Sequence, residues 1–354
     1  MRAVIAVPVK DEAERIGACL RAMAQQQGIA ADAIVLAINN TSDATVTIVR
    51  GLLPLLPVPV HVIEHDFPPE QASAGAARRL AMERAAGLLD ESGVLLTTDA
   101  DGRVPPDWVA ANLHHIAHGA DAVAGRAVLD PAEAALIPAA LHDDDALECA
   151  YAAALDEMAA LIDPEPWDPW PRHTEHSGAS IAVTLSAYRR AGGMPAAALA
   201  EDRRFFAALE RQDARIRHAP EIEVVVSGRT LGRAEGGMAD TIRRRLSLRD
   251  PYLDGALERA ADRLHRLSTR ASFRAAWQGD AAGLDALAEA LRLDRTVIEA
   301  AAQHALFGEA WGGLEAASPA LGRALVPAGR AQGELETGRR ILLTWQQSTV
   351  HAFV

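Results

Sequence analysis

The chain has 354 residues, of which 49% are hydrophobic and 23% charged, and its formal net charge is −13. Such a chain is long enough for a large core, and it favours either one large domain with an extension or two domains. The acidic balance argues against wholesale nucleic-acid binding, because proteins of that class usually carry a surplus of basic residues.

The two cysteines, Cys19 and Cys149, provide neither a disulfide framework nor a zinc-binding spacing, which fits a reducing compartment. The apolar run at the N-terminus lacks the cleavage pattern of a signal peptide. No stretch of the sequence approaches the ~20 apolar residues that a membrane span needs. We therefore expect a cytoplasmic protein without a membrane span.

Apolar runs that are typical of buried strands alternate with amphipathic helices along the first part of the chain. The predicted strands lie at 3–7, 33–38, 60–63, 94–98 and 122–125. Strand–helix alternation with short connections predicts an α/β fold, in which helices flank both faces of a mostly parallel sheet.

The second part of the chain changes from this alternation to a helical pattern. A helical stretch is expected over 131–162, interrupted by a solvated turn at the acidic cluster 142–145. Strands are expected at 177–183 and 222–226, followed by Gly232, Gly236 and Gly237. From about 239 the pattern is helical. We therefore predict a domain at 1–238 and an all-helical extension at 239–354.

Polar clusters follow three of the predicted strands at their C-terminal ends. They consist of Asp11 and Glu12, of Asn39, Asn40 and Asp43, and of Asp99 and Asp101. Open α/β sheets bind ligands at this edge, so the clusters indicate a binding site there.

The Asp99-Ala100-Asp101 turn places two carboxylates at i and i+2 after a buried strand. This arrangement suits a hard divalent cation, Mg²⁺ or Mn²⁺, which takes one or two protein carboxylates and completes its shell with water and phosphate oxygens. The alternative is an ordinary polar turn before a helix near Pro105, and the motif alone does not decide between the two.

Taken in order along the chain, these motifs resemble those of family 2 glycosyltransferases. Pro8-Val9-Lys10-Asp11-Glu12 resembles the Pro-x-x-Asn-Glu start of that family, and 39–45 resembles its Asn-Asn-x-(Ser/Thr)-Asp-x-Thr motif. Ala77-Arg78-Arg79 stands where the family carries Ala-Arg-Asn, Asp99-Ala100-Asp101 matches its Asp-x-Asp (DxD) motif, and Glu201-Asp202 matches its Glu-Asp pair. The resemblance covers roughly residues 3–237.

The resemblance implies a GT-A fold and an inverting enzyme that uses a nucleoside diphosphate sugar. It implies that Asp101 and Asp99 bind the metal ion. The residues expected to bind the donor are Pro8, Asp11, Glu12, Asn39, Asp43, Arg78, Asp99 and Ala100. The chain departs from the family pattern at Asp11 and Arg79, where asparagine is usual, and in its helical extension.

Sugar transfer also makes chemical demands that these residues can meet. A divalent cation stabilises the departing diphosphate as a Lewis acid, and Arg78, with Arg79 or Arg229, can add cationic contacts. The acceptor hydroxyl needs a base opposite the leaving group, and Asp202 is the candidate, which makes the displacement inverting. The alternative for Asp202 is a helix N-cap.

A late histidine often completes the metal site in the family, and His218 is the candidate, although it can equally be an exposed residue before a strand. The acceptor is left open between a small molecule, a glycan and a lipid-linked molecule. The helical extension is expected to cover the acceptor side, to form a homodimer or to bind a partner.

Two other classes of function are considered. A sugar nucleotidylyltransferase would be expected to carry a glycine-rich, basic loop after the first strand, and residues 8–12 contain no glycine. A non-catalytic nucleotide- or carbohydrate-binding protein of the same fold would not need Asp99, Asp101 and Asp202 to be intact.

Overall fold

The computed structural model describes residues 1–229, 232 and 238–351, with side chains up to 347 and at 232. The predicted glycines Gly236 and Gly237 lie outside the described residues. The chain forms two compact units. The first comprises 1–137, 175–210 and 214–247, and the second comprises 138–174, 211–213 and 248–354. The predicted division into domains at 1–238 and 239–354 stays a prediction.

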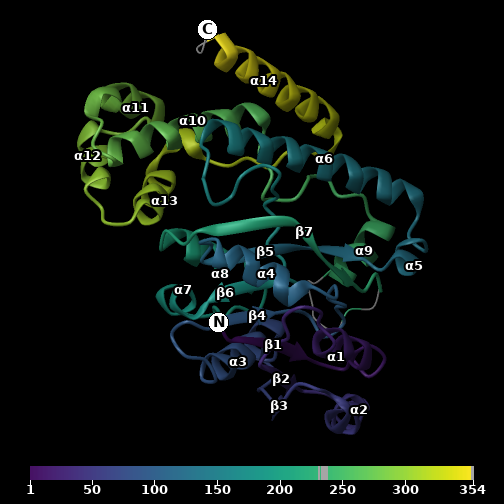
Figure 1. The fold of residues 1–354 in the computed structure, drawn as a ribbon. Helices are drawn as coiled ribbons and strands as arrows, with labels where there is room; N and C mark the ends of the chain where they lie inside the picture. The colour runs from purple at the N-terminus through teal and green to yellow at the C-terminus, as the bar shows by residue number, and fades with distance from the viewer. Residues whose placement is uncertain (230–231, 233–237, 352–354) are drawn as a thin grey trace. The chain divides into compact units, whose positions relative to one another are not determined.

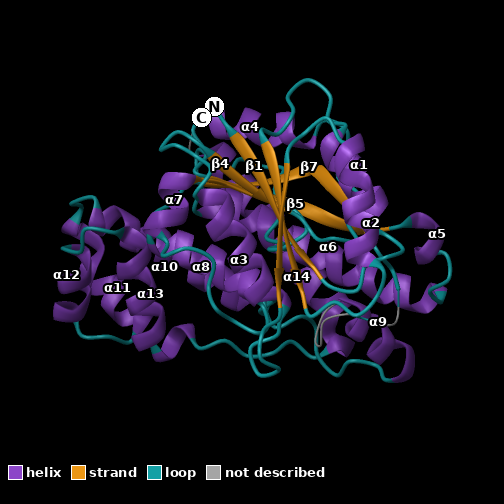
Figure 2. Cartoon of the chain, turned by 90° about the horizontal axis from the view of Figure 1, so that it is seen from below, coloured by secondary structure: helices purple, strands orange, loops and turns teal. Residues whose placement is uncertain are grey.

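The first unit is built on a seven-stranded sheet with the order β3-β2-β1-β4-β6-β5-β7 (Figures 1 and 2). The strands are β1 Ala3–Val9, β2 Ala33–Asn39, β3 Val60–His65, β4 Val94–Thr97, β5 Ala122–Leu129, β6 Ile181–Thr184 and β7 Ile216–Val226. Only β6 runs antiparallel to its neighbours β4 and β5; the other described pairings are parallel. The predicted α/β class with a mostly parallel sheet is confirmed.

Both faces of this sheet are buried, because helices pack on each side. Every residue of β1 is buried, as its uninterrupted apolar sequence indicates. Ile5 and Val7 point into one core layer, which they share with α1 Ile16–Ala24 and α4 Trp108–Ala117. Val4 and Ala6 point into the other layer, with α3 Ala74–Ala86 and α8 Glu201–Arg211.

The remaining helices of the first unit are shorter or lie at its edges. They are α2 Thr45–Leu52, α5 Pro131–Ala134, α7 Leu185–Arg190 and α9 Met238–Ser247.

The second unit is helical, and two apolar clusters hold it together. Its helices are α6 Ala139–Ile162, α10 Ala260–Trp277, α11 Leu284–Leu291, α12 Arg295–Ala302, α13 Phe307–Ala317 and α14 Ala331–His351. One cluster joins α6, α10 and α14, and the other joins α10, α11, α12 and α13 (Figure 1). No helix in the described part of the chain combines the length and apolar character needed to cross a membrane.

The expected interruption at the acidic cluster 142–145 is wrong. The helical stretch breaks earlier, between α5 and α6, and the cluster lies within α6. Pro138 stands at the N-cap of α6, and proline is tolerated at the start of a helix but not inside one. The break therefore follows from the proline, and the acidic residues form an exposed part of the helix.

Candidate active site

The loops after β1 and β2 are joined through residues in the left-handed region of backbone conformation. Asp11 has φ 50° and Asn40 has φ 45°, and short polar side chains adopt such values more readily than most others. The Asp11 Oδ1 atom accepts hydrogen bonds from Ser42 N at 2.7 Å and Ser42 Oγ at 3.2 Å. The carboxylate of Asp11 thus ties the first loop to the second.

Asp43 strengthens the same junction at the start of α2. Its carboxylate accepts hydrogen bonds from Thr45 N at 2.9 Å and from Ala13 N at 3.0 Å. The hydroxyl of Thr45 in turn accepts a bond from Glu12 N at 2.8 Å. The structure therefore brings together the predicted donor-binding residues of these two loops, where they hold the backbone of the strand ends in place.

Arg78 is the centre of a buried hydrogen-bond network that joins distant parts of the chain. Its Nε atom donates to Glu201 Oε1 at 3.1 Å, and its Nη1 atom donates to Thr97 Oγ1 and Gly178 O, both at 2.9 Å. Its Nη2 atom donates to Asp99 Oδ1 at 2.6 Å. Arg78 is only 3% exposed, so this network holds the end of β4 against the start of α8.

The electrostatic balance of this network keeps the guanidinium charged. Burial alone would lower the pKa of Arg78, but the carboxylates of Asp99 and Glu201 raise it above its ordinary value. Gly178 leaves room for the guanidinium, because a Cβ atom there would lie 2.4 Å from Arg78 Nη2. In the structure, the guanidinium of Arg78 donates its hydrogen bonds to acceptors within the protein. A contact between Arg78 and a phosphate stays a prediction.

The second carboxylate of the turn, Asp101, belongs to a different ion-pair system. Arg229, which follows β7, donates from Nη1 to Glu12 Oε2 at 2.8 Å and from Nη2 to the other oxygen of Glu12. The same Nη2 lies 3.3 Å from Asp101 Oδ2. Burial, and then the neighbouring carboxylate of Asp99, raise the pKa of Asp101 to about 6, although Arg229 acts in the opposite direction.

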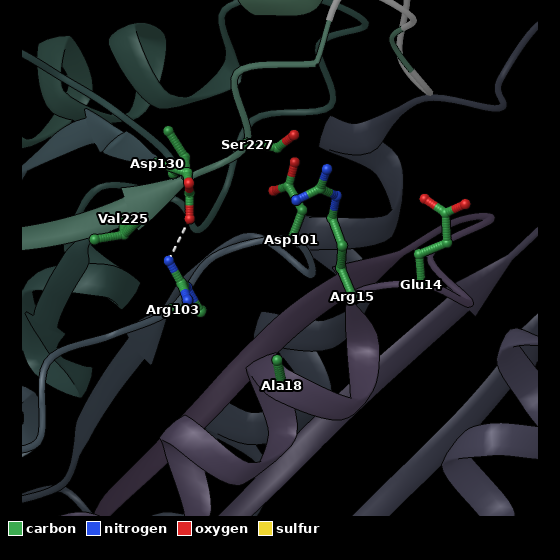
Figure 3. Close-up of a pocket in the computed structure, with 9 residues that line it drawn as sticks. Glu14, Arg15, Ala18, Asp101, Arg103, Asp130, Val225 and Ser227 are labelled. Atoms are coloured by element: carbon green, nitrogen blue, oxygen red, sulfur yellow. Dashed lines mark hydrogen bonds and ion pairs between the residues drawn. The ribbon is translucent and has the colours of Figure 1, made fainter. Parts of the chain in front are cut away.

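A small polar cavity opens beside Asp101 (Figure 3). It has a volume of about 160 Å³, and Figure 3 shows Arg15 and Asp101 directed into it. Its lining residues are Glu14, Arg15, Ala18, Asp101, Arg103, Asp130, Val225, Val226 and Ser227. The cavity thus contains a positively charged side chain, Arg15, and a negatively charged one, Asp101, next to the proposed metal-binding turn.

Glu133 fixes the segment that carries Arg229. Its carboxylate accepts hydrogen bonds from Arg15 Nη2 at 2.6 Å, from Ser227 Oγ at 3.0 Å and from Gly228 N at 2.6 Å. Sequence reasoning missed Glu133 because it lies in a short helix and no motif marks it. The one available signal was the preceding Asp-Pro pair, which is typical of a helix start.

Asp202 lies in the first turn of α8, next to the buried Glu201. Its Oδ2 atom accepts a hydrogen bond from Gly178 N at 2.9 Å, and its Oδ1 atom accepts one from Arg203 N at 2.7 Å. Gly178 therefore links Asp202 through its N–H and Arg78 through its carbonyl. Glu201 faces the Arg78 network, whereas Asp202 keeps a partly exposed carboxylate.

His218 lies inside β7 and is buried, so the alternative of an exposed residue before a strand is wrong. Its Nε2 atom is 3.0 Å from His176 Nε2. The His176 ring stacks on the Phe206 ring, with 4.2 Å between the ring centroids. Among the described residues, no three or more His, Cys, Asp and Glu side chains are arranged to hold a metal ion. A metal-binding role for His218 stays a prediction.

The donor set of the Asp99-Ala100-Asp101 turn nevertheless fits a magnesium or manganese ion. Both cations prefer oxygen ligands and need only one or two protein carboxylates. The ion pairs with arginine use one oxygen of each carboxylate, Asp99 Oδ1 and Asp101 Oδ2. Asp99 and Asp101 are therefore the residues that would hold the metal ion.

Comparison with known proteins gives one family match. Residues 4–155 match the family model described as glycosyl transferase family 2. No curated protein matches the chain.

Three solved structures are among those similar to it. TarS 1–349 from S. aureus in complex with UDP has 14% identity and a TM-score of 0.47 over 98% of this chain and 92% of that one. The mannosyltransferase PcManGT from Pyrobaculum calidifontis, with GDP-Man and Mn²⁺, has 17% identity and a TM-score of 0.44 over 99% of this chain and 83% of that one. Glucosyl-3-phosphoglycerate synthase from Mycobacterium tuberculosis, with Mn²⁺, UDP and phosphoglyceric acid, has 13% identity and a TM-score of 0.40 over 72% and 80%. At these TM-scores the three likenesses carry no argument about this chain.

Proposed function

We propose that the protein transfers a sugar from a nucleoside diphosphate sugar to an acceptor hydroxyl, because residues 4–155 match the family model described as glycosyl transferase family 2. The transfer inverts the anomeric centre and depends on Mg²⁺ or Mn²⁺, and the sheet unit is of the GT-A type. A homodimer and a cytoplasmic location stay predictions.

The observation that carries the proposal is the shared network of Asp99 and Asp202. Asp99 binds Arg78 at 2.6 Å, Arg78 binds the carbonyl of Gly178, and the N–H of Gly178 binds Asp202. The candidate metal ligand and the candidate base are therefore linked through Arg78 and the backbone of Gly178. Positioning of this kind is what a displacement reaction needs, because its base and leaving group must stay on opposite sides of the reacting carbon.

Asp99 and Asp101 would hold the cation, which when bound supplies Lewis-acid stabilisation of the departing diphosphate. Asp202 accepts the proton of the acceptor hydroxyl at its carboxylate as the hydroxyl attacks. A single base on the face opposite the leaving group favours direct displacement and hence inversion.

The other predicted donor-binding residues shape the binding loops. Pro8 is the penultimate residue of the buried strand β1, and Asn39 is the last residue of β2. Asp11 and Asp43 hold the loops that follow, and Ala100 separates the two carboxylates. Arg78 acts as a positioning residue. Arg229 is 19% exposed at its side chain and lies next to Asp101, which makes it the better candidate for a contact with the diphosphate.

The experiment that tests the proposal follows release of nucleoside diphosphate from a panel of nucleotide sugars, with Mn²⁺ and with a chelator. We expect at least one donor to be turned over in the presence of metal and none in its absence. Asp90→Asn is the matched control for substitutions of site aspartates, because Asp90 is a solvent-exposed residue whose side chain accepts hydrogen bonds from the nearby Ser92.

Two outcomes would contradict the proposal. Metal-dependent binding of a donor without any turnover, across a broad acceptor panel, would favour the non-catalytic binding protein. Formation of a nucleotide sugar from a sugar phosphate and a nucleoside triphosphate would favour the nucleotidylyltransferase.

A further inference from the structure

Arg229 contacts two carboxylates of the site in unequal ways. It makes a two-point contact with Glu12, whose side chain is 6% exposed, and a longer single contact of 3.3 Å with Asp101. A bidentate pair with a buried carboxylate is stronger than a single longer contact. Glu12 is therefore the stronger partner that anchors Arg229, and the contact between Arg229 and Asp101 is the weaker one and the more easily lost.

The backbone on the N-terminal side of Arg229 is held in place independently of Asp101. Glu133 accepts hydrogen bonds from Ser227 Oγ and Gly228 N, and it also binds Arg15. A Cβ atom on Gly228 would lie 3.1 Å from Glu133 Cβ, so the two segments pack closely. Loss of the contact with Asp101 would leave Ser227 and Gly228 fixed by Glu133, and the guanidinium of Arg229 fixed by Glu12.

A divalent cation and Arg229 make competing demands on Asp101. A metal ion binds a carboxylate oxygen at about 2.1 Å. With the guanidinium nitrogen 3.3 Å from Oδ2 of the same carboxylate, the two cations would be close neighbours and would repel each other.

On the basis of the function proposed above, we propose that Arg229 is a resident cation of the site that exchanges with the divalent metal. Its guanidinium neutralises Glu12 and Asp101 before the metal binds, and it withdraws from Asp101 towards Glu12 when the metal binds. Arg229 therefore sets the affinity of the metal site and prevents tight metal binding without a donor. Glu12 acts in this exchange as the anchor of the arginine.

The test measures Mn²⁺ binding to the full chain without nucleotide, by electron paramagnetic resonance of the free ion. We expect Arg229→Gln to bind Mn²⁺ about tenfold more tightly than the unmodified protein, because no cation then has to leave Asp101. Arg229→Lys keeps the positive charge and should bind Mn²⁺ within about twofold of the unmodified protein. A thermal unfolding curve for each variant establishes that it is folded.

Arg103→Gln is the matched control. Arg103 also lines the cavity and lies two residues from Asp101, but its ion pair is with Asp130. The substitution removes the same charge without touching Asp101, so we expect the Mn²⁺ affinity to change by less than about twofold.

Three outcomes would overturn the exchange. They are an unchanged or weaker Mn²⁺ affinity of folded Arg229→Gln, an equal gain in Arg103→Gln, and no Mn²⁺ binding by either the unmodified protein or Arg229→Gln. Sugar transfer is judged separately. If the unmodified protein releases nucleoside diphosphate from a donor while Arg229→Gln gains no affinity for Mn²⁺, only the exchange is wrong.

Discussion

Each unit of the protein contains a buried arginine that donates hydrogen bonds to several acceptors. The two arginines differ in the parts of the structure to which these acceptors belong. In the helical unit, Arg266 binds both oxygens of Glu258 at 3.1 and 3.0 Å, Glu315 at 2.6 Å and the carbonyl of Leu321 at 2.8 Å. These acceptors join α10 to the segment before it, to α13 and to the turn that follows α13. The network around Arg266 therefore holds helices together.

In the sheet unit, Arg78 is just as buried, and it differs from Arg266 in the position of its partly exposed partner. The side chain of Asp99 is 35% exposed, and it lies at the C-terminal edge of the sheet. The network also reaches the partly exposed Asp202 through Gly178. Burial and several internal hydrogen bonds are common to both arginines, so they do not mark a functional site. The difference is that Asp99 lies at the C-terminal edge of the sheet, where open α/β sheets bind ligands.

The strongest test of this difference is the Asp202→Asn substitution. An asparagine can still accept the hydrogen bond from Gly178 N, but it cannot take a proton from the acceptor. We expect kcat to fall by about 10³-fold or more, while donor affinity stays within about twofold. Steady-state kinetics and donor titration measure the two effects. If Asp202→Asn remains active, another residue is the base.

Arg78→Met should damage both the fold and the site. Removal of the guanidinium leaves Glu201 buried without its cation, which costs about 3–5 kcal/mol of unfolding free energy. Asp99 also loses the partner that orients it. We expect a large fall in stability by denaturant titration and loss of activity in the protein that stays folded. Full activity of a folded Arg78→Met protein would show that Arg78 does not position the site.

Arg266→Met should separate stability from function. Glu258 keeps an ion pair with Arg263 at 3.5 Å, and Glu315 is 30% exposed, so we expect a smaller loss of about 2–4 kcal/mol. Well below the unfolding transition, donor affinity should match that of the unmodified protein. A tenfold or greater loss of donor affinity would contradict the expectation that Arg266, unlike Arg78, affects only stability.

The smallest expected effect is that of Gly178→Ala. The new Cβ atom would lie 2.4 Å from Arg78 Nη2, so the guanidinium must shift at a cost of about 1–3 kcal/mol. We expect a lower unfolding temperature and a lower kcat.

Gly312→Ala is the matched control, because its Cβ atom would meet nothing within 4 Å and it lies inside α13. It should stabilise the protein by about 0.5–1 kcal/mol. A fall in stability of the same size for both variants would show that the contact with Arg78 is not the cause.

The sequence by itself determined where most of the strands of the sheet unit lie and the edge at which its polar residues gather. The apolar runs at 3–7 and 33–38 lie within β1 and β2, because burial on both faces requires apolar residues at successive positions. The order of the motifs also predicted the family whose model matches residues 4–155.

Only the tertiary structure decided which side chains meet. Glu201 binds Arg78 from 123 positions away, and Glu133 holds Ser227 from 94 positions away. The strand position of His218 and the packing of α6 with α10 and α14 were likewise not foreseen. Hydrophobic periodicity is a local property, and it specifies which face of an element is buried. The partner of a buried charge depends on how whole elements pack, and for Arg78 that packing decides that its guanidinium holds Asp99 and Glu201 together.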